Sequence, residues 1–159
     1  MTTNLQFDKL GYLTPYDAIN TDLTTVERVF VDEFTDSITR RRLFDAYKQY
    51  NAQIQGNLPT GAAFTQWVDG SFVTRKRDPN DIDVVTYIDF RLYEEYEPFF
   101  NSLRQLRYLR QTDIDGYFVR VYPVDHPNHR LFDLDRADWS FRFNTPKPKG
   151  NKGFLELTY

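Results

Sequence analysis

The segment DIDVVTYI, residues 81–88, constrains the fold more than any other part of the chain. Successive side chains of a strand point to opposite faces of the sheet. After the two aspartates, both faces of this segment are apolar or β-branched. They carry Val85 and Tyr87 on one side and Ile82, Val84, Thr86 and Ile88 on the other. Because such a pattern is typical of the centre of a sheet, we predict a buried central strand that begins with two carboxylates.

The spacing of apolar residues elsewhere predicts the elements around this strand. Helices are predicted over 43–54 and 92–106, the second becoming regular near Pro98, and a capping-box pattern predicts a helix start at Thr24. Strands are predicted over 62–68, 117–124 and 154–159. A chain of 159 residues suits one domain, 1–159. The order of elements predicts an α/β or α+β fold in which helices pack on one mixed sheet.

Other segments are predicted to be irregular or exposed to solvent. Residues 1–23 lack a clear period and are expected to form an irregular arm that packs on the body. Residues 126–152 are rich in turn formers, and the Pro/Lys/Gly stretch 144–153 is expected to be a mobile basic loop. The run Arg40-Arg41-Arg42 is expected to be a solvated helix face rather than a nucleic-acid patch.

The composition excludes several classes of protein and site. A formal net charge of −3 argues against a surface that coats nucleic acid or anionic membrane, although local basic patches are compatible with it. The absence of cysteine excludes disulfides, thiolate zinc sites and cysteine nucleophiles. The N-terminus lacks a secretory signal pattern, and no apolar stretch approaches the ~20 residues that span a bilayer. A cytoplasmic protein without a membrane partner is therefore expected.

Asp81 and Asp83 are the first candidates for chemistry. Two residues apart in a strand, they share a face, with Cα atoms roughly 6.6 Å apart. Buried carboxylates are normally paired or bind metals, and Mg²⁺ prefers one or two carboxylates together with substrate phosphates. In the alternative interpretation, these aspartates only cap and solvate a strand that follows the DPND turn. We favour a divalent metal site for Mg²⁺ or Mn²⁺.

Gly70-Ser71 and the basic residues after it are candidates for binding phosphate. A glycine lets backbone amides approach a phosphate closely, a serine hydroxyl can donate to it, and a helix beginning here would favour the anion further. Arg75 and Lys76, followed by Arg77, lie in the connection to the aspartates and could meet outer phosphate oxygens. In the alternative interpretation, Ser71 is a plain turn residue.

Gly70-Ser71, a nine-residue spacer, and Asp81 and Asp83 between apolar residues together form a recognisable pattern. It resembles the signature of the DNA polymerase β-like nucleotidyltransferase superfamily, and above all its small, single-domain members in bacteria and phages. The resemblance implies a mixed-sheet core, two divalent ions, and transfer of a nucleoside monophosphate from an NTP such as ATP to a hydroxyl, with release of pyrophosphate. The sequence departs from the pattern at Asp69, where the superfamily usually has an apolar residue.

The resemblance also implies a third carboxylate on a later strand, completing the catalytic and metal-binding set. Asp115, at the entrance to the strand over 117–124, is the best candidate, with Asp113 and Asp125 as alternatives. The interior of that strand carries Arg120 rather than an acid. A structural role for Asp115 in a strand-entry turn therefore stays open.

Two functions from different classes are compatible with these observations. The first is a metal-dependent nucleotidyltransferase that uses an NTP. The second is the same fold with decayed catalysis, acting as a nucleotide-sensing or antitoxin-like regulatory module with a protein partner. For the enzyme, the acceptor is left open among a protein side chain, an RNA 3′ end, a small molecule and another nucleotide.

Overall fold

A computed structural model describes residues 4–147 and 150–159 of the chain. At its centre is a five-stranded mixed sheet in the order β3-β7-β4-β5-β6. The strands are β3 (Ala18–Asn20), β4 (Thr65–Asp69), β5 (Ile82–Asp89), β6 (Ile114–Val121) and β7 (Phe154–Thr158). β5 pairs antiparallel with β4 and parallel with β6, while β7 pairs antiparallel with β4 and parallel with β3.

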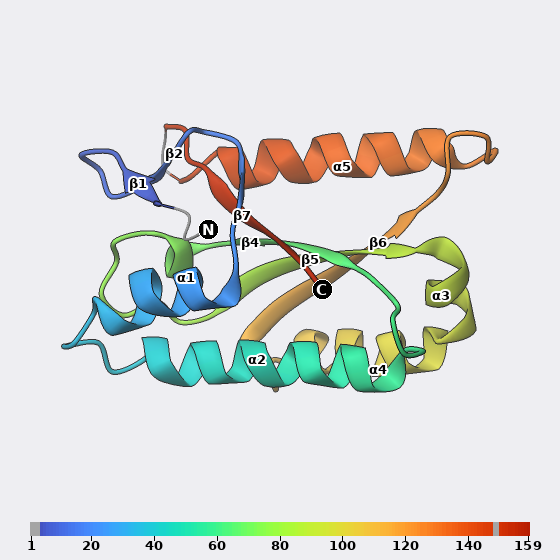
Figure 1. Cartoon of the computed structure of the whole chain (residues 1–159), viewed down its shortest axis with the longest axis horizontal. Coiled ribbons are helices and arrows are strands. Elements are labelled where there is room, and N and C mark those ends of the chain that lie inside the picture. The colour runs from blue at the N-terminus through green and yellow to red at the C-terminus, as the bar shows by residue number, and fades with distance from the viewer. Residues whose placement is uncertain (1–3, 148–149) are drawn as a thin grey trace.

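Helices cover both faces of this sheet (Figure 1). They are α1 (Leu23–Glu27), α2 (Arg40–Asn57), α3 (Phe90–Glu95), α4 (Glu97–Tyr108) and α5 (His129–Asn144). α1, α2 and α4 pack on one face over the larger core, and α5 packs on the other over a smaller core around Trp67, Val85 and Phe143. The predicted fold class, helices on a mixed sheet, is confirmed. In the described ranges no helix is both long and apolar enough to cross a membrane.

β5 is the buried central strand that the sequence predicted. It lies between β4 and β6. Ile82 and Ile88 are buried in the larger core, and Val85 is buried in the smaller one. Because β5 begins at Ile82, Asp81 directly precedes the strand and Asp83 is its second residue.

The other predicted elements are found with shifted ends. The helix over 43–54 lies within α2, and the helix over 92–106 is divided into α3 and α4, with Pro98 in the first turn of α4. The helix expected to begin at Thr24 begins one residue earlier, because the Asp22 carboxylate accepts a hydrogen bond of 2.7 Å from the Thr25 amide and caps it. The strands predicted over 62–68, 117–124 and 154–159 are β4, β6 and β7.

The prediction that residues 126–152 form turns is wrong, because 16 of these residues form α5. The apolar side chains of this helix do not gather on one inward face. Leu131, Leu134 and Phe141 are exposed, whereas Phe143 is buried against the sheet. Sequence patterns identify a helix chiefly by a regular apolar stripe, and α5 lacks one.

The N-terminal arm over 1–23 is more regular than predicted. β1 (Gln6–Phe7) and β2 (Leu13–Thr14) form a separate antiparallel pair, and β3 then joins the main sheet beside β7. Residues 1–3 of the arm lie outside the described ranges. The arm therefore contributes an edge strand to the sheet as well as packing on the body.

The basic loop over 144–153, predicted to be mobile, is anchored at its end. The Lys152 amide donates to the Asn144 carbonyl at 3.1 Å, and the Gly153 amide donates to the Leu13 carbonyl at 2.7 Å. The Lys152 side chain is buried. Residues 148–149 lie outside the described ranges, so the prediction is corrected only for the part that follows them.

The expectation of a solvated arginine face is confirmed for Arg41 and Arg42 but wrong for Arg40, which is fully buried. Its guanidinium donates to five backbone carbonyls, those of Phe30, Phe72, Thr74, Lys76 and Arg77. A buried guanidinium is tolerated when its donors are satisfied in this way. Arg40 thereby fixes the backbone of residues 72–77, the segment between Gly70-Ser71 and the aspartates.

Candidate functional site

Three aspartates lie side by side at one end of the sheet. Asp83 of β5 is paired in register with Asp69 of β4 on one side and with Asp115 of β6 on the other. Neighbouring strands are about 4.8 Å apart, so paired residues on one face bring their side chains close together. Asp81, which directly precedes β5, joins them at this end of the sheet. We call Asp69, Asp81, Asp83 and Asp115 the aspartate row.

The alternatives for the third carboxylate are not paired with Asp83. The Asp113 carboxylate forms an ion pair of 2.7 Å with Arg42 on α2, and its backbone carbonyl accepts from the Ile82 amide. Asp125 is exposed and lies beyond the opposite end of β6. Of the three candidates, only Asp115 is paired with Asp83 across the sheet.

The carboxylates of this row act on one another electrostatically. Burial, and then the nearby charges of Asp81, Asp69 and Asp115, raise the pKa of Asp83 to about 7, against the opposing effect of Lys152. Partial desolvation, followed by the charge of Asp115, also raises the pKa of Asp81. Ionisation of Asp81 and Asp83 is therefore costly in the absence of a bound cation.

Gly70 brings the turn after β4 close to Asp83. Its φ of +82° lies in the region that favours glycine, and a Cβ atom here would lie 2.0 Å from the Asp83 Oδ2 atom. Ser71 begins a 3-10 turn of only three residues, Ser71–Val73. The helix that would favour an anion at this point is therefore not formed, and only the glycine-permitted approach of the backbone remains.

Lys152 explains why an aspartate occupies position 69. Its ammonium forms an ion pair of 2.8 Å with Asp69, and both side chains are less than a tenth exposed. The same ammonium donates to the Gly70 carbonyl at 3.3 Å. Burial raises the pKa of Asp69 to about 6 although Lys152 opposes the shift. Sequence reasoning missed this partner; the signal was an acid at the end of a buried strand, which calls for a cation.

Two cavities flank the row. One, of about 560 Å³, is lined on the Gly70-Ser71 side by Arg75, Lys76 and Lys152. The Arg75 guanidinium is held at 3.0 Å by Glu33, whereas the Lys76 side chain is exposed. This cavity therefore offers cationic groups beside the turn.

The second cavity, of about 630 Å³, is lined by Asp81 and Asp115 together with Arg107, Arg110 and Tyr117. Asp115 accepts a hydrogen bond of 3.3 Å from the Tyr117 hydroxyl and has the Arg107 guanidinium at 3.6 Å. One cavity is thus lined by cations, and the other by two of the carboxylates together with two arginines.

The carboxylates fit a divalent cation in their chemistry rather than as a preformed cage. In residues 4–147 and 150–159, no group of three or more His, Cys, Asp or Glu side chains is arranged to hold a metal ion as it stands. The oxygens of Asp81, Asp83 and Asp115 are nevertheless hard ligands whose charges oppose one another. Mg²⁺ commonly takes one or two protein carboxylates and completes its shell with water and ligand oxygens, so this donor set suits an ion that the protein holds only in part.

Comparison with known proteins gives a family and no function. No curated protein and no solved structure matches the chain at a significant level. The match to a family covers residues 5–158, which is nearly the whole chain. The protein therefore belongs to DUF6932, described as a family of unknown function.

Proposed function

We propose that the protein is a metal-dependent nucleotidyltransferase of the DNA polymerase β-like kind, which transfers a nucleoside monophosphate from an NTP to a hydroxyl. The observation that carries the proposal is the gathering of Asp81, Asp83 and Asp115 beside the Gly70 turn. The pKa values of Asp81 and Asp83 are raised, and a cavity lined by cations lies beside them. This combination suits a metal-bound triphosphate. Such an enzyme would act where NTPs and Mg²⁺ are abundant, in the cytoplasm.

Each residue has a distinct role in this proposal. Asp81, Asp83 and Asp115 would hold Mg²⁺ or Mn²⁺, which when bound would neutralise charge developing on the transferred phosphoryl group. The Gly70 turn and Ser71 would contact the triphosphate, with Lys76 near its outer oxygens. Arg75 and Lys152, both ion-paired within the chain, would form the wall of the same cavity. These groups bind and orient the nucleotide, which is most of what phosphoryl transfer asks of a protein.

The proposed transfer needs no reactant other than the NTP and the acceptor hydroxyl. The acceptor oxygen forms a bond to the α-phosphorus, the bond from that phosphorus to the bridging oxygen of pyrophosphate breaks, and pyrophosphate leaves. The hydroxyl proton passes to the Asp115 carboxylate, whose neighbours Tyr117 and Arg107 keep it in place. Asp115 is therefore the residue whose loss should harm chemistry more than nucleotide binding.

A nucleotide-sensing module without catalysis is the second candidate. It is favoured by the neighbours of Asp115, because the Arg107 guanidinium and the Tyr117 hydroxyl already compensate part of its charge. Arg120, in the interior of the same strand, adds a cation rather than a further acid. The pair of Asp81 and Asp83 beside Gly70 favours the enzyme instead.

Label transfer tests the proposal. The purified protein is incubated with each α-labelled NTP, Mg²⁺ or Mn²⁺ and a cell extract, and labelled products are sought. Asp83→Asn and Asp115→Asn should each reduce labelling at least ~100-fold, the scale of losing one electrostatic or acid–base contributor. Asp113→Asn and Asp125→Asn are the matched controls and should label like the parent.

Thermal unfolding separates binding from chemistry. Mg²⁺ with an NTP should raise the melting temperature of the parent, because a ligand that binds only the native state stabilises it. The double variant Asp81→Asn with Asp83→Asn should lose that rise, whereas Asp115→Asn should keep most of it. A parent that is stabilised by nucleotide but labels nothing would establish the sensing module, and a double variant that responds like the parent would refute the site.

A further inference from the structure

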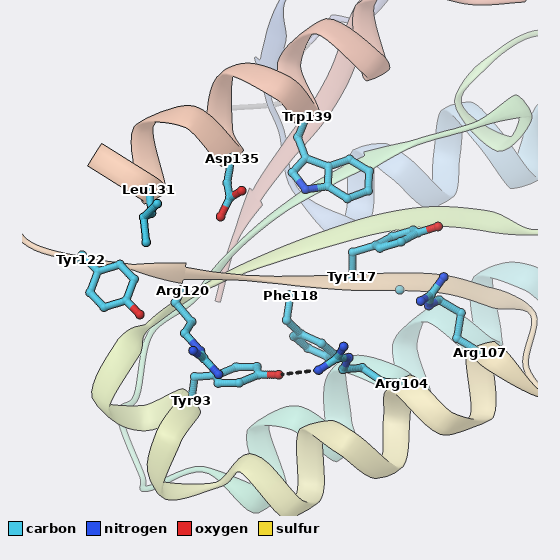
Figure 2. A pocket seen from close by; sticks show the side chains of 11 residues that line it. Tyr93, Arg104, Arg107, Tyr117, Phe118, Arg120, Tyr122, Leu131, Asp135 and Trp139 are labelled. Carbon is cyan, nitrogen blue, oxygen red and sulfur yellow. Dashed lines mark hydrogen bonds between the residues drawn. The ribbon is translucent and has the colours of Figure 1, made fainter. Parts of the chain in front are cut away.

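A groove runs beside β6, on the side of the row away from Gly70. Figure 2 shows β6 passing between α5 and the α3–α4 pair, with the side chains of α5 on one side of the strand and those of α3 and α4 on the other. Side chains from all of these elements line the groove along the strand. The groove has a volume of about 350 Å³. β6 is the last strand of the sheet, so the groove follows an edge strand rather than the closed interior.

Three arginines give the groove a positive character. Arg104 and Arg107 come from α4 and Arg120 from β6, and Asp135 is the one acid among the described lining residues. Arg107 and Arg120 form only long ion pairs, of 3.6 Å with Asp115 and 3.7 Å with Glu97, so a bound phosphate could compete for their N–H groups. In the described ranges Arg104 forms no ion pair at all.

Aromatic rings pack against two of these cations. The Arg107 guanidinium lies 4.2 Å from the ring centroid of Tyr117, and the Arg120 guanidinium lies 4.6 Å from that of Tyr93. Trp139 of α5 packs against Tyr117 with centroids 4.6 Å apart and forms part of the wall. Tyr93 is buried, so the partly exposed Tyr117 and Trp139 are the rings that a base could reach. Cations that follow the phosphates, together with rings that stack on bases, recur in grooves that bind single-stranded polynucleotides.

The groove leads to the carboxylates. Arg107 and Tyr117 line both the groove and the cavity that contains Asp81 and Asp115. The Tyr117 hydroxyl also donates to Asp115. A chain lying along β6 would therefore bring its end to the aspartate that receives the hydroxyl proton in the proposed reaction.

We propose that this groove binds the 3′ end of a single-stranded polynucleotide and that its terminal hydroxyl is the acceptor of the transferred nucleotide, an inference that rests on the proposed function. The 3′ oxygen bonds to the α-phosphorus, pyrophosphate leaves, the hydroxyl proton passes to Asp115, and the chain is extended by one nucleotide. Because arginines would contact the phosphates, binding should weaken as the salt concentration rises.

Direct binding in the absence of NTP and metal tests the groove by itself. Fluorescence anisotropy would follow a 5′-labelled single-stranded RNA of mixed sequence in EDTA. Arg104→Ala, Arg120→Ala and Trp139→Ala should each weaken binding at least about fivefold, the lower end of what a lost stacking or charged contact costs. Each arginine variant should also lower the slope of log affinity against log salt by about 0.7.

Matched controls and competitors make the test decisive. Arg41→Ala removes an exposed, ion-paired arginine of α2 and should bind RNA like the parent. Unlabelled single-stranded RNA should compete fully, and a duplex of the same sequence should compete poorly. Groove variants that bind like the parent would overturn the inference. So would an acidic peptide of equal charge that competes as well as the RNA, which would indicate a protein partner instead.

Label transfer distinguishes this inference from the proposed function. With Mg²⁺ and α-labelled NTP, the same RNA should grow by one nucleotide, and blocking its 3′ hydroxyl should abolish the product. Transfer to another acceptor without RNA binding would overturn the groove inference alone. RNA binding without transfer to any acceptor would overturn the acceptor role together with the proposed function.

Discussion

Arg40 is fully buried and Asp83 is half-buried, and the surroundings of these two ionisable side chains are opposite. The five carbonyls around Arg40 all accept from its guanidinium, and Phe34 covers its face at 3.8 Å. Burial lowers the pKa of Arg40 to about 10, which still leaves it charged at neutral pH. Asp83 is surrounded by three other aspartates, which together with burial raise its pKa to about 7.

The difference separates a structural charge from a functional one. A buried charge whose neighbours complement it stabilises the fold and needs nothing from outside the chain. A buried charge whose neighbours oppose it costs free energy, and such sites recur where a ligand completes the balance. Arg40 holds residues 72–77, and this segment connects the Gly70 turn to the strand that carries Asp83. Substitutions at the two positions should therefore change stability in opposite directions.

The largest effect is expected from Arg40→Ala. The change leaves five buried carbonyls without their donor and empties the space of a large side chain, so the free energy of unfolding should fall by about 3 to 5 kcal/mol in urea titrations. Arg40→Lys should recover part of this loss. Arg41→Ala, which removes an exposed neighbour, should cost no more than about 1 kcal/mol. A loss for Arg40→Ala as small as that of Arg41→Ala would remove the structural side of the comparison.

A smaller loss of stability is expected from Lys152→Met. The substitution leaves Asp69, like Asp83, without a cation that compensates its charge. Without the ammonium, Asp69 is buried with no cation, and the free energy of unfolding at pH 8 should fall by about 2 to 3 kcal/mol. The pKa of Asp69 is about 6 even with Lys152 present, so at pH 5 the carboxyl is protonated and the loss should shrink.

The double variant Asp69→Asn with Lys152→Met is the control for this loss. Removing both charges should restore most of the stability, since a neutral pair leaves no uncompensated charge. A loss that is equal at pH 5 and pH 8 would show that Lys152 acts by packing alone.

An element could be predicted from the sequence where it depends on residues that are close together along the chain. β5 and α2 are set by alternation and helical spacing within a few residues, and both were found. α5 was missed because Leu134 and Phe141 are exposed and leave no regular stripe. The fold class survived this miss because the other predicted helices and strands already give helices packed on a mixed sheet.

The candidate site divides in the same way. Gly70, Asp81 and Asp83 stand out by local spacing, and the approach of Gly70 to Asp83 gives that spacing a geometric reason. The contacts of Arg40 with residues 72–77, and of Lys152 with Gly70, join parts of the chain that are 32 or more residues apart. No local pattern shows which buried charge will meet carbonyls and which will meet another charge, because only the packed fold decides it.

The smallest effect, and one of opposite sign, is expected from Asp83→Asn in metal-free protein. The pKa of Asp83 is about 7 in the fold and near 3.8 in the unfolded chain, so the native state holds a proton that the unfolded state releases between these values. The parent should therefore lose stability as the pH rises from about 4 to about 7. The amide that replaces the carboxyl in the variant carries no charge at any pH, although Asp69, Asp81, Asp115 and Lys152 still face it.

The variant and the parent should be equally stable near pH 4, and the variant should be more stable by about 2 kcal/mol near pH 8, after allowance for solvent screening. Urea titrations in EDTA across this range measure the difference. Adding Mg²⁺ and NTP should then stabilise the parent and not Asp83→Asn, so the order of stability reverses when ligand is present. A variant that is less stable than the parent at pH 8 without metal would mean that Asp83, like Arg40, is held by its neighbours. The row of aspartates would then need no ligand to explain it.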